Sequence, residues 1–190
     1  MTDPPVLDRL PAYVTVEGDG VAVGQGPVRV DAFIDFLCPF CRRFAMSSGP
    51  ALADLVADGQ VSLVYHPLNF LDEASTTGYS TRASAASGCA ADLGRFAEYA
   101  HELYVNQPPE GGPGLTDAEL AGIGRTLGLA DTAFAACVAE GSYLEWPPYV
   151  TARATALGVD ATPTVLVSGT AVGPEPRPIA AAVAKAAGRL

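Results

Sequence analysis

The chain has 190 residues, of which 49% are hydrophobic and 17% charged, and its formal net charge at pH 7 is −10. This length predicts one domain of ordinary size, or one domain that carries an insertion, with a core large enough to fold without a disulfide framework. The acidic balance argues against nucleic acid and anionic membrane surfaces as partners, because both demand clustered basic side chains.

The first twelve residues are rich in proline and aspartate, and we expect residues 1–12 to form a flexible arm. They lack the basic start and apolar core of a signal peptide, and no run in the sequence approaches the roughly 18 apolar residues that span a bilayer. Two locations stay open: the cytoplasm, and an extracytoplasmic compartment reached with a targeting segment outside this sequence. Residues 13–16 and 21–23 flank a turn-forming Glu-Gly-Asp-Gly segment, which predicts a short hairpin.

The next segment predicts a strand, a helix and a second strand. Hydrophobic residues alternate through residues 28–36, as in a β-strand, and recur at helical spacing from residue 39 to about residue 57. Asp58 and Gly59 end this helix, and residues 61–65 have the pattern of a second strand. A strand, a helix and a strand in this order form a βαβ unit, which implies parallel strands and a right-handed crossover.

Residues 75–157 differ from their surroundings, because they are rich in alanine and in aromatic residues at spacings of three and four. The glycine- and proline-rich residues 106–114 interrupt them as an internal loop, too short and too central to link two domains. We expect about four helices here and one more that closes the block, over residues 81–91, 95–105, 117–127, 131–139 and 149–157.

Strands resume at residues 164–167, where a Ser-Gly turn leads into residues 170–172, and an amphipathic helix follows over about residues 178–187. The element order is βαβ, a helical block, then ββα. The fold class is therefore α/β, with a sheet domain interrupted in its middle by helices. The expected domains are a flexible arm at 1–12, a sheet domain at 13–70 and 158–190, and an inserted helical domain at 71–157.

The sequence Cys38-Pro39-Phe40-Cys41 stands where the first central strand ends and its helix begins. At a helix N-terminus, unpaired backbone N–H groups and the helix dipole favour an anion, so we expect Cys38 to be a thiolate at neutral pH. Two intervening residues in a helical turn bring both sulfurs within bonding distance. Cys38 is therefore the expected nucleophile. Cys41 faces inward and is expected to be the more buried, less acidic, resolving thiol.

Two other interpretations of this pair stay open. A CxxC pair is also half of a zinc site, but such a site needs two more ligands, usually from a second CxxC or a CxxH. The remaining cysteines, Cys89 and Cys137, and the two histidines, His66 and His101, are isolated in the sequence. An inert buried pair is the third interpretation. We favour redox chemistry, with no metal and no cofactor.

A second informative segment is Ala161-Thr162-Pro163-Thr164, directly before a predicted strand. A proline that enters a sheet needs a reason. A cis bond between Thr162 and Pro163 would supply one, by leaving the Thr162 backbone free to pair with an extended peptide. Taken alone, the segment favours an ordinary trans proline at a strand start, and its weight comes from its combination with the CxxC pair.

These motifs in this order resemble the DsbA-like branch of the thioredoxin superfamily. The likeness rests on the strand-CPFC-helix segment, the inserted helical block and the sequence ATPTVLVSG near the C-terminus. It covers about residues 28–190 and extends into the insertion at residues 94–99 and 154–159. The resemblance implies a thioredoxin-like fold with an inserted helical domain.

The same resemblance implies roles for individual residues. Cys38 and Cys41 would be the exchanging pair of a thiol-disulfide oxidoreductase, and Pro163 a cis-proline that faces them across the sheet. Thr162 would supply backbone contacts to the substrate. The two residues between the cysteines, Pro39 and Phe40, complete the expected substrate-binding set.

Two positions depart from the family pattern. The best-known members carry histidine next to the resolving cysteine, where it stabilises the thiolate, but this chain has Phe40, which donates no hydrogen bond. We therefore expect a milder oxidant than the strongest members. The family often places a buried acid six residues before the nucleophile, where this chain has Ala32. A water or Asp35 would then serve proton transfer to Cys41, and a solvated or capping role is the alternative for Asp35.

Two further side chains are candidates for the neighbourhood of the pair. Arg42 lies one helical turn beyond Cys38 and would add positive potential, with a solvated arginine as the alternative. His66 ends the second parallel strand, and the carboxyl ends of parallel strands share one edge of a sheet. A structural histidine is the alternative for His66.

Cys89 and Cys137 both fall in the inserted block, 48 residues apart, with no metal-binding spacing. We hypothesise that they form a structural disulfide that holds two helices together, and two independent buried thiols are the alternative. Some DsbA-like proteins resemble this arrangement. A bridge would close a loop and stabilise the folded state by up to about 4 kcal/mol, and its presence would favour an oxidising compartment.

The leading interpretation is an enzyme that donates the Cys38–Cys41 disulfide to reduced, partly unfolded exported proteins. A redox partner, membrane-bound in one version of this hypothesis, would reoxidise it, and neither nucleic acid nor a metal is expected. This function favours an extracytoplasmic location over the cytoplasm. One rival is a reductase or disulfide isomerase of the same fold, and the other is a non-catalytic peptide-binding chaperone module.

Overall fold

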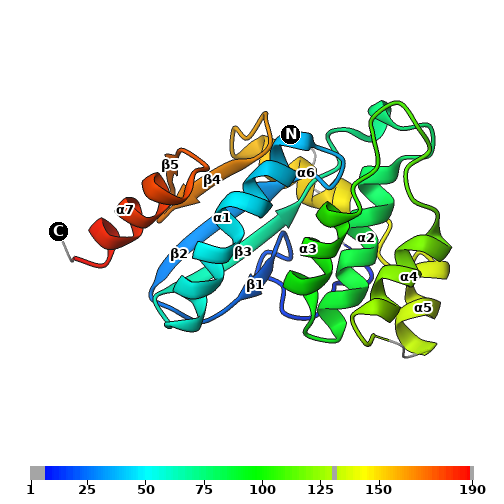
Figure 1. Ribbon diagram of the computed structural model, residues 1–190, viewed down its shortest axis with the longest axis horizontal. Coiled ribbons are helices and arrows are strands. Elements are labelled where there is room, and N and C mark those ends of the chain that lie inside the picture. The colour runs from blue at the N-terminus through cyan, green and yellow to red at the C-terminus, as the bar shows by residue number, and fades with distance from the viewer. Residues whose placement is uncertain (1–6, 130–131, 189–190) are drawn as a thin grey trace.

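The computed structural model describes residues 7–129 and 132–188 and is built around one five-stranded sheet. The strand order is β1-β3-β2-β4-β5; β2 and β3 are parallel, and the other neighbours are antiparallel. Three of the strands precede the helical block and the other two follow it (Figure 1). The strands are β1 (Val21–Val23), β2 (Val28–Ile34), β3 (Val61–Pro67), β4 (Thr164–Val167) and β5 (Thr170–Val172).

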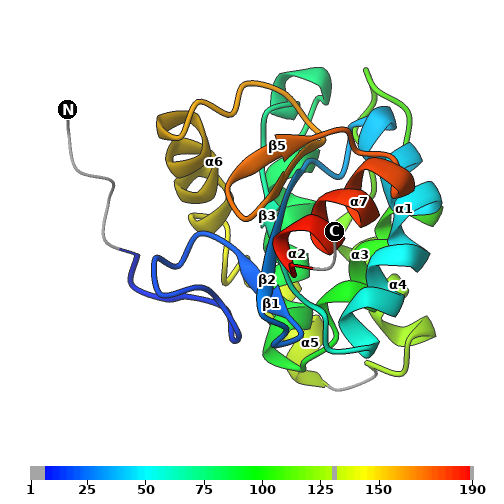
Figure 2. The ribbon, with the colours of Figure 1, turned by 90° about the vertical axis from the view of Figure 1, so that its left-hand side faces the viewer.

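Helices cover both faces of this sheet. Figure 2 shows α1 and α7 on one side and α6 on the other, and Figure 1 shows α2–α5 gathered beyond β3. A short 3₁₀ helix, η1 (Asp72–Ala74), precedes α2. The helices are α1 (Pro39–Ala57), α2 (Tyr79–Asp92), α3 (Phe96–Val105), α4 (Asp117–Thr126), α5 (Thr132–Ala139), α6 (Trp146–Ala156) and α7 (Pro176–Ala186).

The predicted α/β architecture is confirmed, with β2-α1-β3 as the βαβ unit and α2–α6 inserted before β4. Three helices begin earlier than predicted, and the first of them, α2, starts at Tyr79, two residues early. The last helix starts at Pro176, two residues early, and α6 starts at Trp146, three residues early. In both cases prolines occupy the first turn, where the missing N–H has no helical partner to lose.

The predicted N-terminal hairpin is only partly formed. Residues 13–16 contribute one bridge, between Val14 and Val21, and β1 forms its ladder with β3 instead. The turn between them is closed by the Thr15 amide, which donates to the Gly20 carbonyl, and by the Thr15 hydroxyl, which donates to Asp19. The seven-residue strand β3 offers a longer partner than residues 13–16, so β1 pairs with β3.

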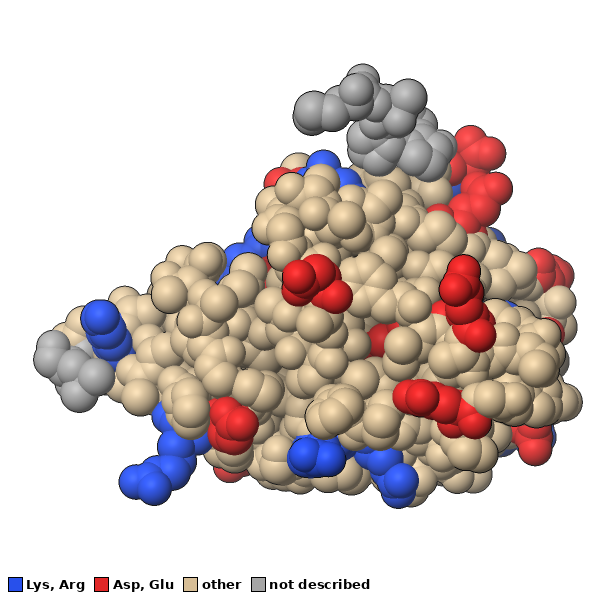
Figure 3. Space-filling model, turned by 90° about the horizontal axis from the view of Figure 1, so that it is seen from above, with Lys and Arg blue, Asp and Glu red and all other residues tan. Residues whose placement is uncertain are grey.

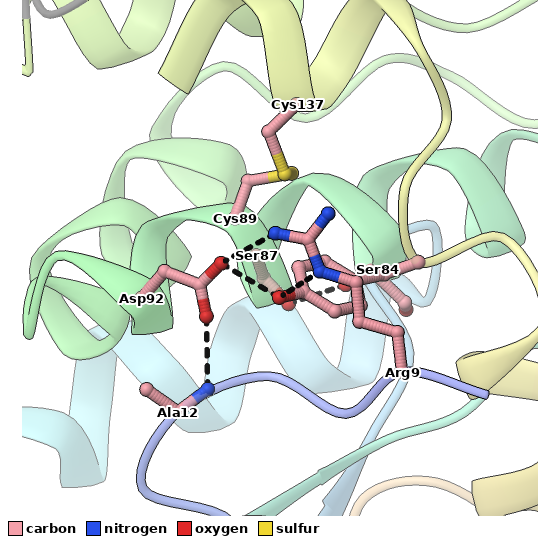
Figure 4. The surroundings of a disulfide bond; sticks show 8 residues. Arg9, Ala12, Ser84, Ser87, Cys89, Asp92 and Cys137 are labelled. Atoms are coloured by element: carbon pink, nitrogen blue, oxygen red, sulfur yellow. Dashed lines mark hydrogen bonds and ion pairs between the residues drawn. A yellow bond between two sulfur atoms is a disulfide. The ribbon is translucent and has the colours of Figure 1, made fainter. Parts of the chain in front are cut away.

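The N-terminal segment is tied to the helical block. The Ala12 amide donates to Asp92 on α2 at 2.9 Å, and the Arg9 guanidinium donates to the Tyr143 hydroxyl at 3.1 Å (Figure 4). Of the expected flexible arm, residues 1–6 lie outside the described residues. From residue 7 on, the chain is anchored at Arg9 and Ala12.

Two helices of the inserted block are joined covalently. Cys89 on α2 and Cys137 on α5 form a disulfide, with a Cα–Cα distance of 5.9 Å (Figure 4). The hypothesis of a bridge in the inserted block is thus confirmed. Among the described residues, no helix is both long enough and apolar enough to cross a membrane.

Candidate active site

The CxxC pair lies at the junction between the central strand β2 and helix α1. Cys38 is the N-cap of α1, with extended backbone angles (φ −69°, ψ 119°), and Pro39 takes the first helical position. This end of α1 lies at the top of Figure 1. Cys41 follows one turn later on the face of α1 that packs into the core, and its side chain is 0% exposed, against 4% for Cys38.

Cys38 has an environment that favours its thiolate. A hydrogen bond from Cys41 is the largest influence and lowers the pKa of Cys38 to about 6. The side chain of Thr162 and the backbone amides of Phe40 and Cys41 act in the same direction, while partial burial opposes them. The lowered pKa has the direction expected from the sequence, but its largest cause is the Cys41 thiol, and the backbone amides of the first helical turn contribute less.

Cys41 has the opposite character. Burial is the main cause that raises the pKa of Cys41 well above its ordinary value, and the adjacent Cys38 raises it further. The Asp35 backbone amide donates to the Cys41 sulfur at 3.4 Å. At neutral pH the pair is therefore one thiolate and one thiol, and the thiolate is the outer one.

Thr162 and Pro163 complete this edge of the sheet. The bond between them is cis, and the Thr162 carbonyl lies 3.4 Å from the Cys38 sulfur. Pairing of β4 with β2 begins at Thr164, opposite Phe33, so the Thr162 backbone lies outside the ladder. The structure thus brings together the two segments that the sequence singled out, which lie more than a hundred residues apart in the chain.

Asp35 is completely buried, so it does not have the solvated role considered for it. Its carboxylate accepts hydrogen bonds from the backbone amides of Leu37 and Leu71 and from the Ser80 hydroxyl. These bonds lower its pKa, but burial outweighs them, and with a smaller effect from Cys38 the pKa of Asp35 rises to about 6. Asp35 caps none of the described helices and instead joins the turn before α1 to the segment after β3 and to α2.

Gln107 is a residue of this site that the sequence analysis missed. Its side-chain amide donates to the Phe36 carbonyl at 2.9 Å and to the Cys38 carbonyl at 3.0 Å. Gln107 belongs to the proline- and glycine-rich loop after α3, which sequence analysis treated only as a connection. Through Gln107 this loop is fastened to the turn that carries the nucleophile.

His66 and Arg42 were candidates for the neighbourhood of the cysteine pair, and the structure favours the alternative role for both. Both ring nitrogens of His66 are engaged, Nδ1 with the Asp19 carbonyl at 2.6 Å and Nε2 with the Asp31 carboxylate at 2.9 Å, and the ring stacks on Phe33. His66 is therefore the structural histidine of the two alternatives. The Arg42 side chain is exposed to solvent on the first turns of α1.

Two hollows flank the cysteine pair. One, of about 240 Å³, is lined by Arg43, Phe44, Pro163 and Glu175 among others. The other, of about 490 Å³, includes Cys38 in its lining. Phe40 lines both hollows, is 59% exposed and lies under the Arg43 guanidinium, 5.2 Å from the ring centroid. An extended chain that crosses this edge would find depressions on both sides of the nucleophile.

The family model described as thioredoxin matches residues 18–183. The chain is similar to reduced DsbA from Mycobacterium tuberculosis, with 32% identity and a TM-score of 0.78 over 90% of this chain and 93% of that one. The reduced disulfide bond oxidoreductase DsbG from the same organism has 32% identity and a TM-score of 0.78, over 90% of this chain and 89% of that one. Oxidised BdbD from Bacillus subtilis, with 17% identity and a TM-score of 0.74 over 94% and 98% of the two chains, shares the fold.

A curated relative is the serine/threonine-protein kinase PknE of Mycobacterium tuberculosis, 40% identical over 138 residues. The match covers 68% of this chain and 24% of the kinase, so the chain spans about a quarter of the length of the curated relatives it matches. The family match, the two structural relatives from one organism and the CxxC pair beside a cis-proline agree with one another. The chain belongs to the thioredoxin family and, within it, to the DsbA-like thiol-disulfide oxidoreductases.

Proposed function

We propose that this protein oxidises pairs of thiols in exported proteins by exchange with a Cys38–Cys41 disulfide. One observation carries the direction of the reaction: the pKa of Cys38 is lowered to about 6. A stabilised thiolate stabilises the reduced form of the pair, and a pair whose reduced form is stabilised takes electrons from other thiols.

The oxidation takes two exchange steps. A substrate thiolate attacks the Cys38 sulfur, forms a substrate–Cys38 disulfide and expels the Cys41 sulfur, which takes up a proton. A second substrate thiolate then attacks the substrate sulfur of this mixed disulfide, expels Cys38 as a thiolate and leaves a disulfide in the substrate. Two electrons have then passed to the Cys38–Cys41 pair, and a redox partner removes them to restore the disulfide.

Four residues around the pair are the proposed substrate-binding set. The backbone of Thr162 lies beside Cys38 and outside the sheet ladder, which suits pairing with an extended substrate segment. Pro163 fixes this segment, and Pro39 and the 59% exposed Phe40 offer apolar surface next to the nucleophile. Such contacts are independent of most side chains of the substrate, as a general oxidant of unfolded chains requires.

We place this activity outside the cytoplasm. The Cys89–Cys137 disulfide supports that location, because disulfides persist in oxidising compartments and are rare where thiols are kept reduced. The reoxidising partner would then act in the same compartment, whether in solution or in a membrane.

The equilibrium reduction potential of the Cys38–Cys41 pair tests the proposed direction. It is measured in glutathione buffers of graded composition, by trapping free thiols and counting the label by mass spectrometry. We expect a potential above about −200 mV, in the range of oxidants and isomerases. A value near about −270 mV, typical of thioredoxin, would contradict the proposal and favour a reductase.

A further inference from the structure

The hollow of about 490 Å³ beside Cys38 is acidic. Two carboxylates face it, one from Glu110 in the loop after α3 and one from Asp160 just before β4. Both side chains are exposed, and neither takes part in an ion pair or side-chain hydrogen bond found among residues 7–129 and 132–188. Their charges are therefore available to a bound molecule. The rest of the lining is mainly apolar, with Phe70 and Leu71 on one wall.

The loop that carries Glu110 is held in place on both sides. Three residues before it, the Gln107 side chain is bonded to the carbonyls of Phe36 and Cys38. One residue after it, the Gly111 amide donates to the Ala74 carbonyl at 2.7 Å. Because these bonds fix the loop in advance, a ligand of Glu110 need not order it.

The hollow on the other side of the pair differs in charge. It holds Arg43, whose guanidinium lies over the Phe40 ring, together with Glu175. This hollow therefore already holds a cation, and the positive charge of Arg43 offsets the negative charge of Glu175. Figure 3, seen from above Figure 1, shows acidic groups spread over the middle and right of this face, while basic groups lie mostly at its margins. The negative potential beside the nucleophile is therefore one-sided.

We propose that Glu110 and Asp160 select substrate thiols that have a lysine or arginine next to the reactive cysteine. The inference rests on the proposed oxidase function and adds a substrate preference to it. An extended substrate across Thr162 places the neighbours of its cysteine in the two hollows, and a basic side chain fits the hollow with two unpaired carboxylates. A nearby cation also lowers the pKa of the substrate thiol and so enlarges the fraction that is thiolate, the attacking species. The acidic hollow would thus select substrates whose thiols are already more ionised before binding.

The test uses three short dithiol peptides that differ only in the residue beside one cysteine: arginine, glutamine or glutamate. The fully oxidised protein is mixed with each, the reaction is quenched with acid, and the second-order rate of Cys38–Cys41 reduction is measured by mass spectrometry. The same rates are measured for Glu110→Gln/Asp160→Asn. Asp54→Asn/Glu140→Gln is the matched control, because it removes two exposed charges of the same sign elsewhere. The intrinsic reactivity of each peptide cancels when proteins are compared.

We expect the wild type and the control to react faster with the arginine peptide than with the glutamate peptide. In the Glu110→Gln/Asp160→Asn variant the ratio of these two rates should be about threefold to tenfold smaller. Raising the salt to about 0.5 M should shrink the wild-type ratio as well, because exposed charges are screened. An equal ratio in wild type and variant would overturn the inference while leaving the oxidase function intact. A wild type that oxidises none of the peptides would contradict the proposed function itself.

Discussion

The molecule holds two cysteine pairs that differ in spacing, in surroundings and in bonding state. Cys38 and Cys41 lie three residues apart at a helix N-terminus, where one sulfur is a thiolate at neutral pH. Cys89 and Cys137 lie 48 residues apart on two packed helices and are bonded to each other. The first pair contacts the edge that faces a substrate, and the second braces the inserted helical block.

The difference teaches that position, and not the thiol itself, assigns the role. Near Cys38, N–H groups and a neighbouring thiol stabilise a negative charge, so the sulfur exchanges readily. The sulfurs of the second pair are bonded to each other and join α2 to α5, so neither of them is a thiolate. The following predictions test whether exchange activity depends on the first pair and stability on the second.

The largest effect is expected from Cys38→Ser. A serine hydroxyl is not ionised at neutral pH, so the oxidation of reduced, unfolded proteins should fall by at least about three orders of magnitude. The Cys89–Cys137 bridge should remain, and thermal unfolding below pH 6, where the Cys38 thiolate adds no stability, should change little. The assay is the gain of activity in a disulfide-dependent reporter enzyme as it refolds.

Cys41→Ser is the matched control for that experiment. It keeps the nucleophile but removes the resolving thiol. When the reduced variant is mixed with a substrate that already carries a disulfide, the Cys38 thiolate should attack that bond, release one substrate thiolate and leave a substrate–Cys38 disulfide that no Cys41 thiol cleaves, visible on a non-reducing gel. Undiminished exchange activity in Cys38→Ser would contradict the assignment of the nucleophile. If that variant instead protects clients from aggregation as well as the wild type does, a chaperone activity exists beside the exchange.

The second largest effect is expected from Cys89→Ala/Cys137→Ala, and it should appear in stability. Opening a loop of this length costs about 2–4 kcal/mol of the free energy of unfolding, measured by urea denaturation. Exchange activity should persist at temperatures where the variant is folded. The comparison would break if the variant lost activity without losing stability, because the bridge would then act on the site.

A pH titration sharpens the contrast on the side of Cys38. Alkylation of the reduced protein by iodoacetamide should follow the thiolate and have its midpoint near pH 6, the pKa of Cys38. The folded pKa is lower than the unfolded value of about 8.5, so the unfolded state binds more protons in between. The stability that this thiolate adds should therefore be complete above about pH 8.5 and disappear as the pH falls through 6.

The reference for that titration is Cys41→Ala. The hydrogen bond from Cys41 is the largest cause of the lowered pKa, so its removal should move the alkylation midpoint to higher pH. A midpoint that stays near 6 would assign the lowered pKa to the backbone amides of the helix instead. A midpoint near 8.5 in the wild type would remove the basis for the proposed direction of electron flow.

Most of the fold and the cysteine pair were predictable from the sequence, because the signals are local. Alternation in β2, helical spacing in α1 and the strand-to-helix position of Cys38 all lie within about thirty residues of each other. The bond between Cys38 and Thr162 spans 124 residues, and it was expected only because the order of motifs resembled a known family. No pattern around Thr162 alone would have placed it there.

The residues that were missed or left open depend on distant contacts. Gln107 reaches Cys38 across 69 residues from a loop with no periodic pattern, so only the folded chain reveals it. Asp35 has the same local sequence whether it is solvated or buried. Its burial comes from Leu71 and Ser80, which approach from the segment after β3 and from α2. Side-chain roles of this kind follow from tertiary packing, whereas the role of Cys38 follows largely from its helix.

The smallest effect is expected from Phe40→His, which tests why this site should be a milder oxidant. A histidine next to Cys41 would place a hydrogen-bond donor beside the Cys38 thiolate. If that lowers the pKa of Cys38 by about one further unit, it stabilises the reduced form by about 1.4 kcal/mol and raises the two-electron reduction potential by about 30 mV. Phe40→Leu, which adds no donor, should leave the potential within a few mV of the wild type, although both variants lose the ring under Arg43. An equal rise in both would show that release of Arg43, and not the imidazole, had stabilised the thiolate.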